Sequence, residues 1–276
     1  MCIRDRAYPI YQLVLISLYD YGQEQVSGGA PLEFLGLGNY QKLLGDQQFW
    51  GVFGQTVAFA AVCVVGTLLV GAFLAILATR VRTWVRMTLF LAALGAWSTP
   101  AVAGSTIWLF LFDANFGFVN EVLGIQGFSW TFDKWTAFGL VAAQVIWCSF
   151  PFVMVTLYAG IKAIPGEVVE AATLDGASRF RFLWQVLFPL VAPGLVATSV
   201  LSFIHAWNDF LFAKTFIISA VENQTLPLAL QVFVKPDQND WGAIMAGSTL
   251  MTIPVLIFFV LVQRRLVSGL AGAVKG

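Results

Sequence analysis

Long apolar runs dominate the chain. Five of them reach the roughly 20 residues that a helix needs to cross a bilayer core of about 30 Å. These predicted spans cover residues 55–78, 87–112, 137–161, 188–212 and 242–262. A sixth run, residues 7–19, is too short to cross at about 1.5 Å per residue. We interpret it as the remainder of a first helix whose N-terminal half is missing, through truncation or a mispredicted start, because the six residues before it have no apolar core of their own. A cleaved signal peptide is disfavoured, because no small-residue cleavage site follows the run.

The pattern therefore predicts an all-α membrane protein with six transmembrane helices, the first of them truncated. Proline removes a backbone donor and favours a kink where it falls in a helix. Kinks are therefore expected in several spans, at Pro100, Pro151, Pro189, Pro193 and Pro254.

The loops differ strongly in basic residues. Eleven of the fifteen lysines and arginines fall on one side of the predicted spans and four on the other. Cytoplasmic loops carry the excess of Lys and Arg, so both termini are expected in the cytoplasm. The 20–54, 113–136 and 213–241 loops then face outward. Two cytoplasmic ends require an even number of spans, which supports counting the short first run as a helix.

Composition excludes several other classes of protein. Apolar residues make up 59% of the chain and charged residues 11%, against about 45–50% and about 25% in soluble domains. Fifteen basic residues balance fifteen acidic ones, which leaves no positive excess to hold a nucleic acid. Cys2, Cys63 and Cys148 have no Cys-x-x-Cys spacing, so we expect small buried hydrophobes rather than a disulfide framework or zinc site.

The connection between the fourth and fifth predicted spans is too long for a simple turn. Pro165 can open a helix, and Glu167 and Glu170 then lie in its first turns, where the helix dipole favours negative charge. Gly176 can provide a left-handed stop. The sequence thus predicts a short helix over residues 165–174.

A second helix is predicted after that turn. Ser178 is a plausible N-cap, and apolar residues recur on one face of the following segment at helical spacing, namely Phe180, Leu183, Trp184 and Leu187. Such an elbow could lie in the lipid headgroups with this stripe in the membrane. The two carboxylates of the first helix would, however, be repelled by an anionic leaflet, which favours a protein partner.

The same segment resembles a known motif. Glu170-Ala-Ala-Thr-Leu-Asp-Gly176, nine further residues and Val186-Leu-Phe-Pro189 are similar to the EAA motif of bacterial ATP-binding-cassette importer permeases, with two apolar replacements. The resemblance implies one permease domain over residues 1–276, with a coupling loop at 162–189 that docks on a separate ATPase. The residues it assigns to coupling are Glu170, Ala171, Ala172, Asp175, Gly176, Ala177 and Pro189.

Other segments extend this resemblance to carbohydrate-uptake permeases. Residues 34–40, 100–108 and 147–152 are similar to the first of the two paired permeases in such systems. Residues 206–212, 225–227, 240–243 and 269–276 are similar to the second. Which member of the pair this chain represents therefore stays open, as does a joined gene model.

The resemblance also implies partners and a location. A permease of this family would lie in the bacterial inner membrane with a homologous second permease, two cytoplasmic ATPases and an extracytoplasmic solute-binding protein. No cofactor is expected on this chain, because ATP and Mg²⁺ would be bound by the ATPases. The sequence itself has no Gly-x-x-x-x-Gly-Lys-Ser/Thr loop, and the single histidine, His205, cannot form a catalytic triad or metal site in the spans.

A carrier driven by protons or sodium is the rival transporter class. Such carriers usually need ionisable groups near mid-membrane, and the spans offer only His205, Asp209 and Lys214. For a sugar substrate, aromatic rings and neutral polar side chains are the expected contacts. The candidate pathway residues are Trp207, Asn208, Asp209, Trp147 and Gln144. Trp207 could instead be an interfacial anchor, and Asn208 a hydrogen bond between helices.

Overall fold

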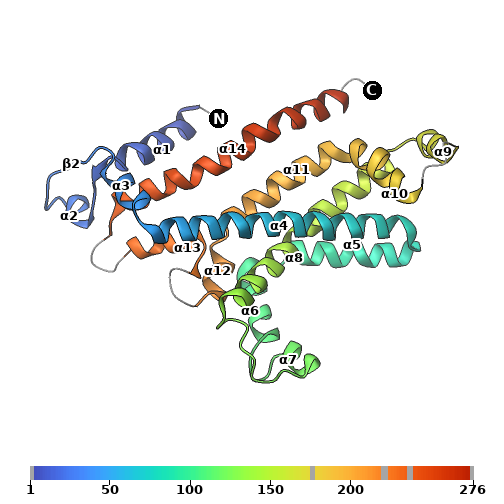
Figure 1. Ribbon diagram of the computed structural model, residues 1–276, viewed down its shortest axis with the longest axis horizontal. Helices are drawn as coiled ribbons and strands as arrows, with labels where there is room; N and C mark the ends of the chain where they lie inside the picture. Colours follow the sequence, from blue (N-terminus) through green and yellow to red (C-terminus); the bar gives the residue numbers. More distant parts are fainter. Residues whose placement is uncertain (1–2, 175–177, 219–222, 235–238, 274–276) are drawn as a thin grey trace.

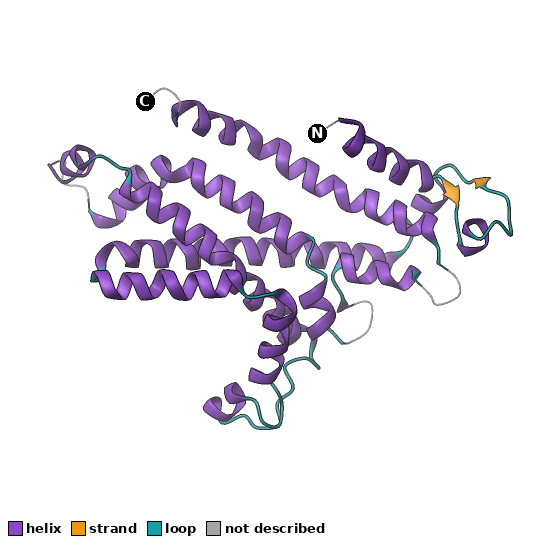
Figure 2. Ribbon diagram, turned by 180° about the vertical axis from the view of Figure 1, so that it is seen from behind, coloured by secondary structure: helices purple, strands orange, loops and turns teal. Residues whose placement is uncertain are grey.

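The computed structural model describes residues 3–174, 178–218, 223–234 and 239–273. It is a bundle of long helices (Figures 1 and 2). Four single helices in the described part are long and apolar enough to span a membrane, and they confirm four of the five predicted spans. They lie within α4 (Gln47–Arg80), α8 (Lys134–Lys162), Trp184–Trp207, which contains α11 (Phe188–Trp207), and α14 (Trp241–Ala273).

The predicted span at 87–112 is two helices rather than one. α5 (Thr83–Ser98) and α6 (Ala101–Leu111) meet at an angle of 106°. Pro100 explains the break, because a proline disfavours helical backbone at the residue before it, and Thr99 is extended (φ −68°, ψ 122°). Pro151, Pro193 and Pro254, in contrast, lie inside continuous helices.

The first helix, α1 (Ile3–Ile16), packs against α14. A short two-stranded ribbon follows, formed by β1 (Tyr19–Asp20) and β2 (Glu33–Phe34), so the chain is not strictly all-α. Two small helices, α2 (Gln23–Val26) and α3 (Gly38–Leu44), complete this end of the molecule. Asn39 of α3 donates hydrogen bonds of 2.9 Å to the carbonyls of Ser17 and Tyr19, which joins α3 to the end of α1.

The remaining helices are short. α7 (Phe118–Leu123) follows α6 and extends away from the bundle (Figure 1). α9 (Gly166–Leu174) and α10 (Arg179–Phe182) lie between the spans, and a π-helical turn, η1 (Leu183–Leu187), leads into α11. α12 (Leu211–Phe216), α13 (Leu226–Ala229) and the 3₁₀ turn η3 (Leu230–Phe233) lie between α11 and α14.

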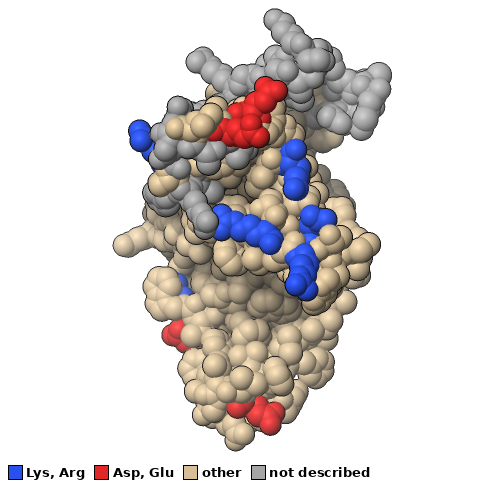
Figure 3. All heavy atoms as spheres, turned by 90° about the vertical axis from the view of Figure 1, so that its right-hand side faces the viewer, with Lys and Arg blue, Asp and Glu red and all other residues tan. Residues whose placement is uncertain are grey.

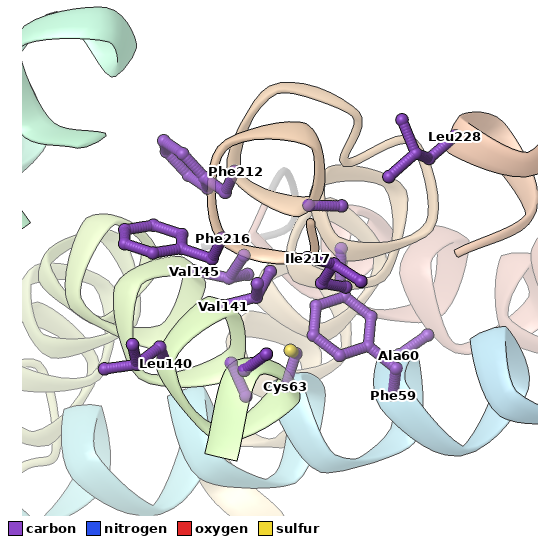
Figure 4. Packing of buried hydrophobic residues seen from close by; sticks show 14 of the residues in the cluster. Phe59, Ala60, Cys63, Leu140, Val141, Val145, Phe212, Phe216, Ile217 and Leu228 are labelled. Atoms are coloured by element: carbon purple, nitrogen blue, oxygen red, sulfur yellow. The ribbon is translucent and has the colours of Figure 1, made fainter. Parts of the chain in front are cut away.

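The main core lies where α4 crosses α8. Phe59 and Cys63 of α4 pack with Val141 of α8 and with Phe216 of α12, and Figure 4 shows these side chains together. Cys63 is a fully buried free thiol, as predicted for a small hydrophobe. Cys148 is also free but only half-buried.

Gly71 allows α4 and α8 to approach closely. A Cβ atom at this position would lie 2.6 Å from both Cβ and Cγ1 of Val153, whereas a Cβ atom on Gly54 of the same helix meets nothing within 4 Å. Gly71→Ala is therefore expected to destabilise the protein by about 1–3 kcal/mol. Gly54→Ala should instead be neutral or stabilise it by up to about 1 kcal/mol.

Thermal denaturation of the two purified variants checks this difference. A lower melting temperature for Gly71→Ala alone is the expected result. Equal melting temperatures would show that the α4–α8 contact is not tight.

Candidate functional site

Basic residues gather at one end of the bundle. Arg80 ends α4, Arg82 and Arg86 begin α5, and Lys162 ends α8. These helix ends lie together on the right of Figure 1, and Figure 3 views that end, with lysine and arginine side chains across its middle. The loops that the sequence assigns to one side of the membrane thus lie at one end of the molecule.

α9 lies at the extremity of this end (Figure 1). Its range, Gly166–Leu174, confirms the predicted helix at 165–174. Glu167, Glu170 and Ala171 are exposed, Ala172 is buried, and the apolar side chain of Leu174 is 88% exposed. Asp175, Gly176 and Ala177 lie outside the described residues, so the predicted glycine turn is not described.

The chain after this gap differs from the expected elbow. Ser178 is the predicted N-cap, and its Oγ accepts a hydrogen bond of 3.3 Å from the backbone N–H of Arg181. The helix that starts there does not stop, because α10, η1 and α11 follow one another without a break. Pro189 has no backbone N–H, so it cannot donate a hydrogen bond to the carbonyl four residues earlier. The π-helical turn η1 ends two residues before this proline.

The predicted apolar stripe on this segment divides in two. Leu187 is buried, whereas Trp184 is exposed and its ring lies 5.0 Å from that of Phe188. The side chains of Phe180 and Leu183 are not described. Trp184 therefore adds an exposed aromatic ring to the same end of the molecule as α9.

A cavity of about 340 Å³ lies between α5, α6, α8, α11 and α12. Its wall combines the Trp97 ring with the hydroxyl groups of Thr99 and Ser202. Ser149 Oγ and His205 Nδ1, also in the wall, lie 2.9 Å apart and link α8 to α11. A wall of hydroxyl, imidazole and indole groups can hydrogen-bond a neutral polar ligand. The three hydroxyl residues could not be predicted as part of a site from the sequence, because serine and threonine in an apolar helix usually bond their own backbone.

Trp207 lies in the core instead. Its side chain is 1% exposed, and its ring stacks on Phe203 at 5.5 Å. The indole Nε1 donates a hydrogen bond of 3.1 Å to the carbonyl of Met251 on α14. This position favours a packing role in the conformation described here.

The two residues after Trp207 shape the end of α11. The exposed Asn208 donates from Nδ2 to the carbonyl of Ile204 on its own helix at 2.9 Å. The buried Asp209 accepts a hydrogen bond of 3.1 Å from the backbone N–H of Ala213 in the first turn of α12. Both contacts are local and stabilise the turn between α11 and α12.

Gln144 and Trp147 lie together on α8, facing α6. The Trp147 and Trp108 rings are 6.1 Å apart. Gln144 is fully buried, and both its Nε2 and Oε1 lack a hydrogen-bond partner within the described part of the chain. The structure therefore brings these two candidates together, next to α6 and apart from the contacts of Trp207.

The sequence matches a known protein family. Residues 67–272 match the family described as binding-protein-dependent transport system inner membrane component. The diacetylchitobiose uptake system permease protein DasB of Streptomyces coelicolor is 34% identical over 82% of this chain and 70% of its own length. DasC, a second permease protein named for the same system, is 46% identical over 46% of each chain.

A solved structure shares the fold. It is a bacterial alginate transporter of the ATP-binding-cassette type, in complex with a periplasmic protein that binds an alginate pentasaccharide. One of its chains superposes with a TM-score of 0.76 at 14% identity, over 93% of this chain and 86% of that one. Together with the apolar spans, the family match shows a multi-pass membrane protein that serves as a transport subunit rather than an enzyme. The chain belongs to the family of inner membrane components of binding-protein-dependent transport systems.

Proposed function

We propose that this chain is a permease subunit of an ATP-driven importer for mono- or oligosaccharides or related polyols. α9 is the observation that carries the proposal: a helix at the extremity of the basic end, with exposed carboxylates and a Leu174 side chain that is 88% exposed. A soluble domain that covers this helix would bury the apolar side chain, and a basic cleft would pair with the Glu170 carboxylate.

The partner at this end is a cytoplasmic ATPase. Glu170, Ala171, Ala172, Asp175, Gly176, Ala177 and Pro189 are assigned to this contact through their resemblance to the EAA motif. Two ATPases hold ATP and Mg²⁺, and closure of their dimer displaces α9. The continuous helix from α10 to α11 transmits that displacement into the membrane, because a helix moves as a rigid element.

The topology follows from the charge distribution. We propose six spans with both termini in the cytoplasm, counting α1 and the bent pair of α5 and α6 as one span each. A homologous second permease completes the pathway, and an extracytoplasmic solute-binding protein delivers the ligand.

The substrate class rests on the cavity. Its hydroxyl and imidazole groups suit hydroxyl-rich ligands, and Trp97 offers a ring for their apolar faces. The names of DasB and DasC, both diacetylchitobiose uptake permeases, point to the same class. Gln144 lies one helical turn from this cavity on α8, and Trp147 directly precedes Cys148 of its wall, while pathway roles for Trp207, Asn208 and Asp209 would need another conformation.

Reconstituted transport tests this proposal. The complex, assembled with its second permease and ATPases in liposomes, should take up labelled diacetylchitobiose, maltose or trehalose only with ATP and the binding protein. Uptake that persists without the ATPases and stops when the proton gradient is dissipated would identify a carrier and overturn the proposal.

A further inference from the structure

Gln144 is an unusual residue for the interior of a membrane bundle. Its amide is fully buried, yet among the residues that the structure describes neither the Nε2 donor nor the Oε1 acceptor has a hydrogen-bond partner. A buried polar group left unpaired costs roughly 1–3 kcal/mol, and an apolar residue of the same size would avoid this cost. A group that costs stability in one conformation is expected to find its partner in another.

Gly104 of α6 covers this amide. A Cβ atom on Gly104 would lie 3.3 Å from Gln144 Nε2 and 4.0 Å from the Trp147 ring. The backbone of α6 therefore lies directly over the amide, and a side chain at this position would make a tight contact with it.

The cavity ends one helical turn away. Its wall includes Cys148 of α8, four residues after Gln144, and Ala101 of α6, three residues before Gly104. Residues three or four apart share one face of a helix, so Gln144 and Gly104 continue the same two faces just beyond the cavity. A small displacement of α6 away from α8 would extend the cavity to the amide.

α6 is also placed to move as a unit. It is an 11-residue helix, separated from α5 by the 106° break at Thr99 and Pro100. The hydroxyl of Thr99 bonds the carbonyl of Gly95 at 2.8 Å, so this carbonyl near the end of α5 is satisfied without α6. Rotation at this break need not disrupt the hydrogen bonds of either helix.

We infer that α6 is a gate that covers Gln144, and that displacement of α6 exposes the Gln144 amide to a hydroxyl-rich ligand in the cavity. This inference rests on the proposed sugar transport. A carboxamide has one acceptor and two donor hydrogens, which match adjacent hydroxyl groups. The paired rings of Trp108 and Trp147 lie beside it and offer a surface for the apolar face of a sugar ring.

Gln144→Met tests the inference, with Thr67→Val as a matched control. Thr67 Oγ1 on α4 is likewise buried with no partner among the described residues, but Thr67 does not line the cavity. Both substitutions remove an unpaired polar group at nearly constant volume, so both should raise the melting temperature of the complex. Gln144→Met should also raise KM for the transported sugar by roughly tenfold, the loss expected for about 1.4 kcal/mol of hydrogen bonding. Thr67→Val should leave KM unchanged.

Wild-type KM for Gln144→Met would overturn the inference while leaving the proposed function intact. Failure of the wild-type complex to transport any tested sugar would count against the proposed function instead. Accessibility gives a second test, which does not depend on transport. In a complex with its native cysteines replaced, Gln144→Cys should react with a small hydrophilic thiol reagent at least tenfold faster after trapping with ATP and vanadate. Equal rates in the resting and trapped complexes would show that α6 does not uncover this position.

Discussion

Uptake is expected to fall by roughly 100-fold or more when Glu170 is replaced by lysine, while the complex still inserts in the membrane. The substitution places a positive charge where we propose contact with basic or polar groups of the ATPase. Truncating one partner of a buried charge pair at an interface costs roughly 2–5 kcal/mol, and a reversed charge adds repulsion to that loss. ATP-driven uptake in liposomes and co-purification of the ATPase measure the two consequences.

Glu167→Lys is the matched control for this variant. Glu167 and Glu170 are both exposed carboxylates on α9, but only Glu170 lies within the EAA-like motif. Glu167→Lys is expected to retain most of the uptake and the ATPase. Equal losses of uptake in the two variants would show that the contact depends on the overall charge of α9 and would contradict a specific role for Glu170. Normal uptake in Glu170→Lys would rule out its role in coupling.

Trp207→Ala is expected to prevent stable folding. The side chain is 1% exposed and contacts α4 and α14 through Phe53 and Met251. Truncation of a buried tryptophan to alanine costs roughly 3–5 kcal/mol, a large part of the stability of a typical domain. The yield of monodisperse protein and its melting temperature should both fall.

Trp207→Phe separates packing from ligand contact. It keeps most of the ring volume and loses the hydrogen bond to the Met251 carbonyl, a net cost of about 0.5–1.5 kcal/mol. A packing residue should then show a modestly lower melting temperature with unchanged KM for sugar. A large rise in KM at normal stability would instead place Trp207 in the pathway.

Much of the fold could be predicted from the sequence. Spans such as α4 and α8 are uninterrupted apolar runs, so their existence follows from length and hydropathy. The helix at Gly166–Leu174 was also predictable, because Pro165 and the early glutamates mark its start. These features depend only on neighbouring residues.

Features that depend on tertiary contacts could not be predicted. Pro100 accompanies a sharp break, whereas Pro151, Pro193 and Pro254 lie within continuous helices. All four residues that precede these prolines are subject to the same local restriction, but the extended backbone of Thr99 at the break is not encoded by the local pattern alone. Trp207 is likewise a residue type that often contacts sugars, and only the placement of α4 and α14 shows that its ring is enclosed.

Cross-linking from Leu174 tests the central claim most directly. This residue is 88% exposed at the end of α9, so a photoreactive amino acid there should not disturb the bundle. In membranes that contain the assembled complex, we predict an adduct with an ATP-hydrolysing subunit, with a yield that changes when ATP and vanadate are added. Adducts with lipid alone, in the presence of that subunit, would contradict the claim that α9 couples this chain to an ATPase.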